Sequence, residues 1–150
     1  MEEGGLVVGV EDKFMIICIV ELILMSMAVF FDYKYKEIPL WIIATSGVIS
    51  ISEAILKMTI YEALFAIIPG MIMLIVSWLS KQSMGYGDGL LALSIGLAFG
   101  VNKMVLGISV AFFVSGLVSL ALLVIKKAKR NDTLPFVPFL FIGMVVSMFA

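Results

Sequence analysis

The sequence has 150 residues, of which 63% are hydrophobic and 14% are charged, far from the composition of a soluble domain. A soluble globule of this size cannot bury so much apolar surface, so the composition indicates an integral membrane protein. Ten basic and eleven acidic residues nearly cancel, which argues against nucleic acid as a partner. The chain has no histidine, which excludes Ser-His and Cys-His nucleophile pairs and histidine-ligated zinc sites.

Cysteine chemistry is equally limited, because Cys18 is the one cysteine in the chain. A lone cysteine forms neither an internal disulfide nor a thiolate metal cluster. The apolar run around Cys18 is typical of a small buried side chain. Any catalytic chemistry is therefore expected to use carboxylates.

Six apolar stretches follow one another along the chain and are predicted to be transmembrane helices. They span residues 14–31, 38–56, 63–79, 89–101, 104–125 and 134–150. The fourth is shorter than the roughly 20 residues that cross a hydrocarbon core of about 30 Å. No long linker separates the stretches, so the sequence predicts one membrane-embedded domain over residues 1–150, with an all-α fold of six transmembrane helices.

Basic residues set the expected orientation of this bundle. One side holds Lys34, Lys36, Lys81, Lys126, Lys127, Lys129 and Arg130, and the other holds Lys13, Lys57 and Lys103. The side with more basic residues is expected to face the cytoplasm, which puts both termini outside. The acidic residues before the first stretch are atypical of a signal peptide, so this helix is expected to stay in the mature protein, in the inner (cytoplasmic) membrane of the cell.

Three acids lie within or at the edge of the apolar stretches, where an ionisable group is costly: Glu21, Asp32 and Asp88. Asp32 ends the first stretch and Asp88 precedes the fourth, so both approach the cytoplasmic boundary from the same side. We expect them to meet in a recessed cavity at the cytoplasmic edge. Two carboxyl groups in such a cavity cannot both ionise easily, so the charged one activates water and the protonated one polarises a carbonyl, as in aspartic proteases.

Each acid also has a simpler interpretation. Asp32 alone fits an ordinary interface residue, Asp88 fits a helix N-cap, and Glu21 fits a hydrogen-bonded structural glutamate near the middle of the membrane. The helix dipole at the start of the fourth stretch favours Asp88 as the base. The two aspartates nevertheless titrate as a unit, and the sequence does not assign the proton to either of them.

Three motifs at the ends of these stretches resemble those of the type IV prepilin peptidases, the membrane aspartic peptidases of the Gly-x-Gly-Asp type. They are Asp32 followed by Ile38-Pro39, then Gly85-Tyr86-Gly87-Asp88, and then Leu134-Pro135-Phe136-Val137-Pro138-Phe139-Leu140. The resemblance implies that Asp32 and Asp88 are catalytic and that no metal or organic cofactor takes part. Further residues are expected to bind substrate or shape its loops: Gly85, Gly87, Pro39, Pro135 and Pro138.

The resemblance also implies a substrate, since the family removes short basic leaders from prepilins or pilin-like secretion subunits at the cytoplasmic face of the membrane. The expected partners are such a substrate and the lipid bilayer, with a second copy of the chain as a further candidate. Leu90 departs from the family pattern, because many members carry a lysine there. The chain also lacks the cysteine-bearing cytoplasmic insertion of larger members, so it is similar to a compact, peptidase-only form.

Two other functions compete with this interpretation. Presenilin-like intramembrane aspartic proteases share Gly-x-Gly-Asp, but they pair it with Tyr-Asp and Pro-Ala-Leu motifs, whereas Asp32 follows Phe31 and no Pro-Ala-Leu occurs. A small proton-coupled transporter would use Glu21 as its proton carrier. Such transporters resemble this chain less, because they have fewer helices and no glycine-flanked aspartate.

Overall fold

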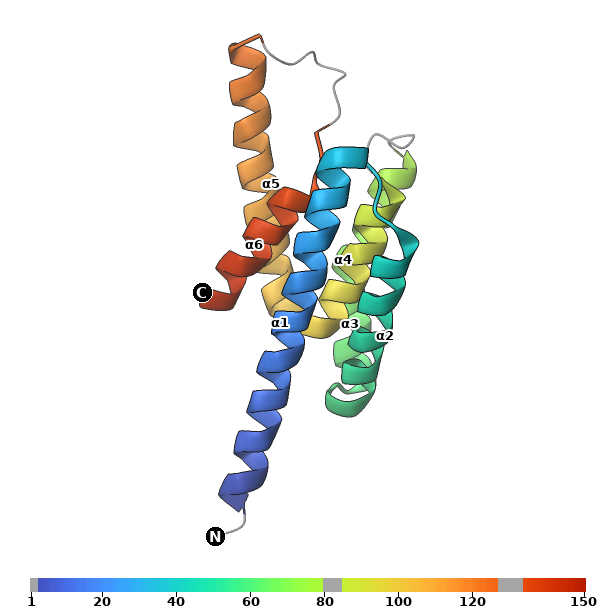
Figure 1. Ribbon diagram of the computed structural model, residues 1–150, viewed down its shortest axis with the longest axis vertical. Helices are drawn as coiled ribbons and strands as arrows, with labels where there is room; N and C mark the ends of the chain where they lie inside the picture. Colours follow the sequence, from blue (N-terminus) through green and yellow to red (C-terminus); the bar gives the residue numbers. More distant parts are fainter. Residues whose placement is uncertain (1–2, 80–84, 127–133) are drawn as a thin grey trace.

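The computed structural model describes residues 3–79, 85–126 and 134–150, and all regular secondary structure in these ranges is helical (Figure 1). The helices are α1 (Glu3–Tyr35), α2 (Leu40–Lys57), α3 (Ile60–Leu79), α4 (Tyr86–Phe99), α5 (Val101–Val124) and α6 (Val137–Phe149). The all-α class predicted from the sequence is confirmed. Four basic residues that support the predicted orientation lie outside the described residues: Lys81, Lys127, Lys129 and Arg130.

Four helical segments are long and apolar enough to cross a membrane. They are Asp12–Tyr35 within α1, and the whole of α2, α3 and α5. The remaining two helices, α4 and α6, are apolar but shorter, with 14 and 13 residues. The chain is thus a multi-pass membrane protein, while the count of six spans stays a prediction.

The bounds of all six helices differ from the predicted ones by a few residues or more, and the starts of α1, α4 and α5 differ most in their consequences. α1 begins at Glu3 rather than at residue 14. α4 begins at Tyr86 rather than at residue 89, so part of the glycine-rich stretch is helical. Gly100 is the one residue between α4 and α5. Its φ of 83° is a conformation that glycine adopts readily because it has no Cβ, and this allows one helix to end and the next to begin within a single residue. The predicted loop at 102–103 therefore lies inside α5.

α4 is the central helix of the bundle, and it packs against α1, α2, α3 and α5. Nine of its 14 residues are buried. Several of these are small, among them Gly89, Ala92, Ser94, Gly96 and Ala98. Small side chains let neighbouring helices approach closely, which is the usual way to pack helices in lipid. Because α4 is surrounded, its first turn is carried into the interior of the bundle.

In two helix pairs, α3–α4 and α5–α6, glycines allow the two backbones to lie in direct contact. A Cβ atom on Gly70 of α3 would lie 2.7 Å from the backbone nitrogen of Leu93 in α4, and one on Gly96 of α4 would overlap the carbonyl oxygen of Ala66 in α3. In the other pair, a Cβ atom on Gly143 of α6 would overlap the carbonyl oxygen of Gly107 in α5. Any side chain at Gly96 or Gly143 would therefore push the helices apart.

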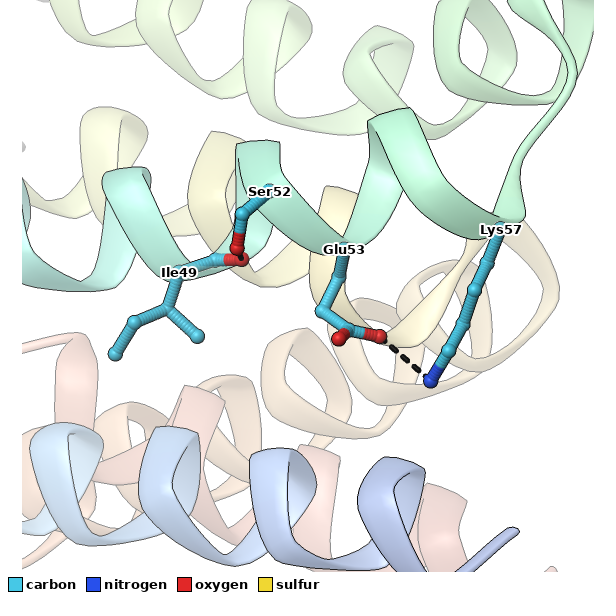
Figure 2. A network of polar contacts seen from close by, with 4 residues as sticks. All are labelled: Ile49, Ser52, Glu53 and Lys57. Atoms are coloured by element: carbon cyan, nitrogen blue, oxygen red, sulfur yellow. Dashed lines mark hydrogen bonds and ion pairs between the residues drawn. The ribbon is translucent and has the colours of Figure 1, made fainter. Parts of the chain in front are cut away.

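The C-terminal end of α2 carries an ion pair (Figure 2). The ammonium group of Lys57 lies 2.6 Å from Oε2 of Glu53, one turn earlier. This oxygen is buried and accepts no well-aligned hydrogen bond from the described residues, so the ion pair is what stabilises it. The ammonium also lies 5.0 Å from the ring centre of Phe14, a cation–π contact between α2 and α1. Beside the pair, the exposed Ser52 hydroxyl donates to the carbonyl oxygen of Ile49 in its own helix.

Candidate active site

Asp32 lies one turn before the C-terminal end of α1, and its side chain is buried, with 5% of the residue exposed. The helix stops here because Lys36 adopts a left-handed conformation with φ of 55°. In that conformation its backbone N–H donates a hydrogen bond of 2.9 Å to the carbonyl oxygen of Asp32, as in the αL motif that ends many helices. The turn that follows α1 therefore begins with Lys36 and Glu37, which line the same cavity as Asp32.

Pro39 completes the connection from α1 to α2. It is the N-cap residue of α2, with φ of −59° and ψ of 133°, and its carbonyl oxygen accepts a hydrogen bond of 3.0 Å from the N–H of Ile42. The sequence placed Pro39 inside the first helical turn, whereas the structure places it one position earlier. Its restricted φ suits this extended cap and fixes the direction in which α2 leaves the turn.

Asp88 is the third residue of α4 and is also buried, with 6% exposed. Its backbone N–H donates a hydrogen bond of 3.1 Å to the carbonyl oxygen of Gly85, which is the N-cap of the helix. The interpretation of Asp88 as a helix N-cap is therefore wrong. The Asp88 carboxyl group is not used to cap α4, because no side-chain hydrogen bond caps this helix.

The two glycines of the motif bring the start of α4 close to other groups. A Cβ atom on Gly87 would lie 3.3 Å from Cβ of Ile38, which is tighter than ordinary contact. A Cβ atom on Gly85 would lie 3.6 Å from Oδ1 of Asp88, an ordinary contact. Gly87 thus sets the distance between α4 and the turn that follows Asp32.

Asp32 and Asp88 line one cavity of about 440 Å³, although 56 positions separate them in the sequence. Their carboxyl groups interact electrostatically. The other lining residues come from the turn after α1, from the start of α2 and from the start of α4: Lys36, Glu37, Ile38, Leu40, Ile43, Gly85, Tyr86, Gly87 and Leu90. A volume of this size admits water together with several peptide residues.

The cavity is lined by both charged and apolar side chains. Lys36 and Glu37 accompany the two aspartates, whereas the other side chains that line it are mostly apolar. Leu90, which stands where the resemblance implies a lysine, is one of the apolar lining residues and is 37% exposed. Among the residues that the structure describes, no group of three or more His, Cys, Asp or Glu side chains is placed to hold a metal ion.

One contact of the site was missed from the sequence. The backbone N–H of Val137 donates a hydrogen bond of 3.2 Å to Oδ2 of Asp32. Val137 is the first residue of α6, where backbone N–H groups have no partner within the helix and are free to bind an anion or an acceptor. Asp32 and Asp88 therefore both lie at a helix N-terminus, so the dipole argument that favoured Asp88 as the base does not separate them.

Two predicted site residues lie beside this contact rather than in the cavity wall. Pro135 precedes α6, and Pro138 is its second residue. Neither they nor Pro39 are among the residues found to line the cavity. Pro138 suits the first turn of a helix, because it brings a fixed φ and no N–H group. The prolines thus shape the start of α6, which in turn presents the Val137 N–H to Asp32.

Glu21 lies on α1, and its side chain faces α2 rather than the cavity that the two aspartates line. It is completely buried, and its two carboxyl oxygens accept hydrogen bonds from Ser46 and Ser50. These serines were not identified from the sequence. Their spacing of four residues was the signal that could have revealed them, since it places two hydroxyl groups on one face of the helix.

A comparison with protein families identifies one that matches. The family model described as the type IV leader peptidase family covers residues 18–124, which includes both aspartates. The family resemblance drawn from the motifs is thereby confirmed. No match to this chain is found among the curated proteins or among the solved structures.

Proposed function

The chain belongs to the type IV leader peptidase family, and we propose that it is an aspartic endopeptidase that removes the leader peptide of type IV prepilins or pilin-like secretion subunits. The observation that carries this proposal is the meeting of Asp32 and Asp88 in one cavity. Two buried carboxyl groups that interact with each other are the catalytic groups that an aspartic peptidase requires. The family match also favours this function over a presenilin-like protease or a transporter.

The proposed reaction is attack of water on a peptide carbonyl. The ionised aspartate takes a proton from water as the oxygen forms a bond to the carbonyl carbon, and the protonated aspartate donates to the carbonyl oxygen. Collapse of the tetrahedral intermediate breaks the C–N bond, and the leaving amine receives a proton from the pair. The products are a leader carboxylate and a new N-terminal amine. The Val137 N–H keeps the Asp32 carboxyl group oriented throughout the reaction, because it donates a hydrogen bond to Oδ2 and takes no part in proton transfer.

The cavity suits a substrate whose character changes at the cleavage point. With one aspartate protonated, the other aspartate and Glu37 still outnumber the one base, Lys36, among the lining residues, and this negative charge favours a basic leader. Leu40, Ile43 and Leu90 offer an apolar wall to the hydrophobic segment that follows. The proposed orientation has six spans with both termini outside, in the inner (cytoplasmic) membrane, so that cleavage takes place at its cytoplasmic edge.

The test is cleavage of a prepilin-like substrate by the purified protein in detergent or membranes. The substrate carries a basic leader, a glycine and then a hydrophobic helix. We expect the wild type to cleave it and Asp32→Asn and Asp88→Asn each to lose at least about 10³-fold in kcat, because each removes one half of the acid–base pair. Asp12→Asn is the matched control, since Asp12 is an exposed acid of α1, and it should cleave like the wild type. Equal cleavage by all four proteins would refute the proposed pair.

The pH dependence gives a second check of the same proposal. Activity requires one carboxyl group ionised and the other protonated, so kcat/KM should rise and then fall with pH in a bell-shaped profile. Acid protonates both groups, and alkali ionises both. A profile that rises to a plateau and stays there would show that one ionised group suffices, which contradicts the two-aspartate mechanism.

A further inference from the structure

Glu21 and two serines form a buried polar contact that the proposed reaction does not use. Ser46 donates a hydrogen bond of 2.7 Å to Oε2 of Glu21, and Ser50 donates one of 2.9 Å to Oε1. All three residues are completely buried. No basic side chain among the described residues forms an ion pair with Glu21. Both oxygens of the carboxyl group are therefore engaged by hydroxyl groups of α2.

The serines belong to the face by which α2 enters the bundle. The buried residues of α2 recur every fourth position: Ile42, Ser46, Ser50 and Ala54. Two of the four are serines, and both point at the same carboxyl group of α1. An interhelical contact of this kind fixes both the rotation and the lengthwise register of α1 against α2, because two hydrogen bonds one turn apart cannot be kept if either helix slides or turns.

Asp32 depends on that rotation and register. It follows Glu21 by eleven residues on the same continuous helix, which is about three turns, so both side chains leave nearly the same face of α1. The wall of the cavity that Asp32 lines also includes Leu40 and Ile43 of α2. A shift of α1 against α2 at Glu21 would therefore move Asp32 against that wall and against Asp88.

We propose that Glu21 is a positioning residue for the proposed peptidase reaction: together with Ser46 and Ser50 it sets α1 so that Asp32 meets Asp88. The inference rests on the proposed function, but it assigns to Glu21 a geometric role rather than a proton-carrying one. A glutamine retains the geometry, because its amide accepts from one serine and donates to the other. A methionine has similar length and makes neither hydrogen bond.

The experiment compares Glu21→Gln, Glu21→Met, Ser46→Ala and Ser50→Ala in the prepilin cleavage assay, with kcat and KM measured on folded monodisperse protein. We expect Glu21→Met to lower kcat by about 10- to 100-fold, the effect of misplacing a catalytic group by about 1 Å. KM should change less than kcat, because the apolar lining residues of α2 and α4 keep their places. Each serine variant should show a smaller loss in the same direction, and Glu21→Gln should stay near the wild type. Ser52→Ala is the control, since Ser52 donates to its own helix.

A distance measurement supplies a readout that simple destabilisation would not move. Spin labels at the exposed positions Tyr33 of α1 and Val48 of α2, introduced in a Cys18→Ala background, report the placement of α1 against α2. The distance distribution should shift or broaden in Glu21→Met and remain that of the wild type in Glu21→Gln and Ser52→Ala. If Glu21→Met fails to fold, the two serine variants provide the same comparison.

Two results would overturn the inference. One is an unchanged kcat and an unchanged distance in folded Glu21→Met, which would leave the contact without a positioning effect. The other is equal loss of kcat in Glu21→Gln and Glu21→Met, which would assign the role to the charge or proton of Glu21. If the wild type does not cleave the substrate, the proposed function fails, and the distance measurement alone decides whether Glu21 positions α1.

Discussion

The pair α5–α6 and the pair α1–α2 are held together in different ways. Gly107 and Gly143 bring the backbones of α5 and α6 into direct contact, so this interface depends on the absence of side chains. Glu21, Ser46 and Ser50 join α1 and α2 by hydrogen bonds, so that interface depends on particular chemical groups. Inside a bilayer there is no water to drive helices together, and both close packing and hydrogen bonds can replace it.

The difference teaches what each interface tolerates. A glycine contact is lost when the glycine is replaced by any residue with a Cβ atom, whether that residue is polar or apolar. A polar contact survives changes in size as long as donor and acceptor remain. The catalytic proposal draws on both types, because the hydrogen bond from Val137 to Asp32 reaches the site from α6, which the glycine contact holds, and Asp32 itself lies on α1. Substitutions at the two interfaces should therefore produce different patterns of damage.

The largest effect is expected for Gly143→Ala. Its new methyl group would overlap the carbonyl oxygen of Gly107 and lie 3.1 Å from the backbone nitrogen of Ala111, and backbone atoms cannot turn aside. We expect a loss of about 2–3 kcal/mol in stability, the upper range for overpacking, measured by thermal unfolding in a mild detergent. Cleavage activity should fall too, because a displaced α6 carries Val137 away from Asp32.

Gly116→Ala is the matched control for this substitution. Gly116 lies on α5, the helix that Gly143 of α6 contacts, but a Cβ atom there would meet nothing within 4 Å. Alanine is favoured over glycine inside a helix by up to about 1 kcal/mol, so this variant should be as stable as the wild type or more so. Equal destabilisation by the two variants would contradict the close contact of α5 and α6.

An intermediate effect is expected for Gly87→Ala, which acts on the cavity rather than on a helix pair. Its methyl group would press on Ile38, at 3.3 Å from Cβ and 3.4 Å from Cδ1. Because a side chain can yield by a few tenths of an ångström, the protein should stay folded while kcat/KM falls by about tenfold, or roughly 1.4 kcal/mol of transition-state stabilisation. Ile38→Val should restore part of the activity to Gly87→Ala, and a complete lack of rescue would place the damage elsewhere.

The smallest effect is expected for Lys57→Gln at the C-terminal end of α2. The side chain of Lys57 is 30% exposed, and ion pairs four residues apart on a partly exposed helix face contribute only about 0.3–0.5 kcal/mol. Glutamine still offers an N–H donor to the buried Oε2 of Glu53, so the substitution removes the charge but not the partner of this oxygen. Loss of the contact with Phe14 adds a similar amount. The free energy of unfolding, measured by thermal unfolding, should therefore fall by less than about 1 kcal/mol, and this loss should be smaller at high salt. A loss as large as that of Gly143→Ala would show that the end of α2 is a major support of the fold.

Sequence patterns predicted the helices and the two aspartates because these depend on local properties. Apolar length and composition give the membrane helices, and charge in an apolar chain singles out Glu21, Asp32 and Asp88 without any knowledge of packing. The extent of α4 was harder, since three glycines in five positions are typical of a loop. Tyr86, Gly87 and Asp88 are nevertheless helical, because the start of α4 packs against the turn that follows α1.

The partners of the acids could not be read from the sequence. The hydrogen bond to Asp32 comes from Val137, 105 positions away, and is donated by a backbone group that carries no sequence signature of its own. Glu21 was identified as a hydrogen-bonded structural glutamate, but Ser46 and Ser50 are paired with it by the packing of α1 on α2. Long-range register between helices decides both contacts, and no local pattern encodes it.

The glycine contacts of the two helix pairs also affect how stability depends on temperature. Soluble domains unfold with a large positive heat-capacity change, because apolar surface passes from the interior into water, and their stability therefore has a maximum near room temperature. When α3 separates from α4, or α6 from α5, in a bilayer, the surface that Gly96 and Gly143 had kept in contact passes into hydrocarbon instead. The heat-capacity change should then be small, and the stability of these pairs should fall almost linearly on warming, with no corresponding weakening in the cold.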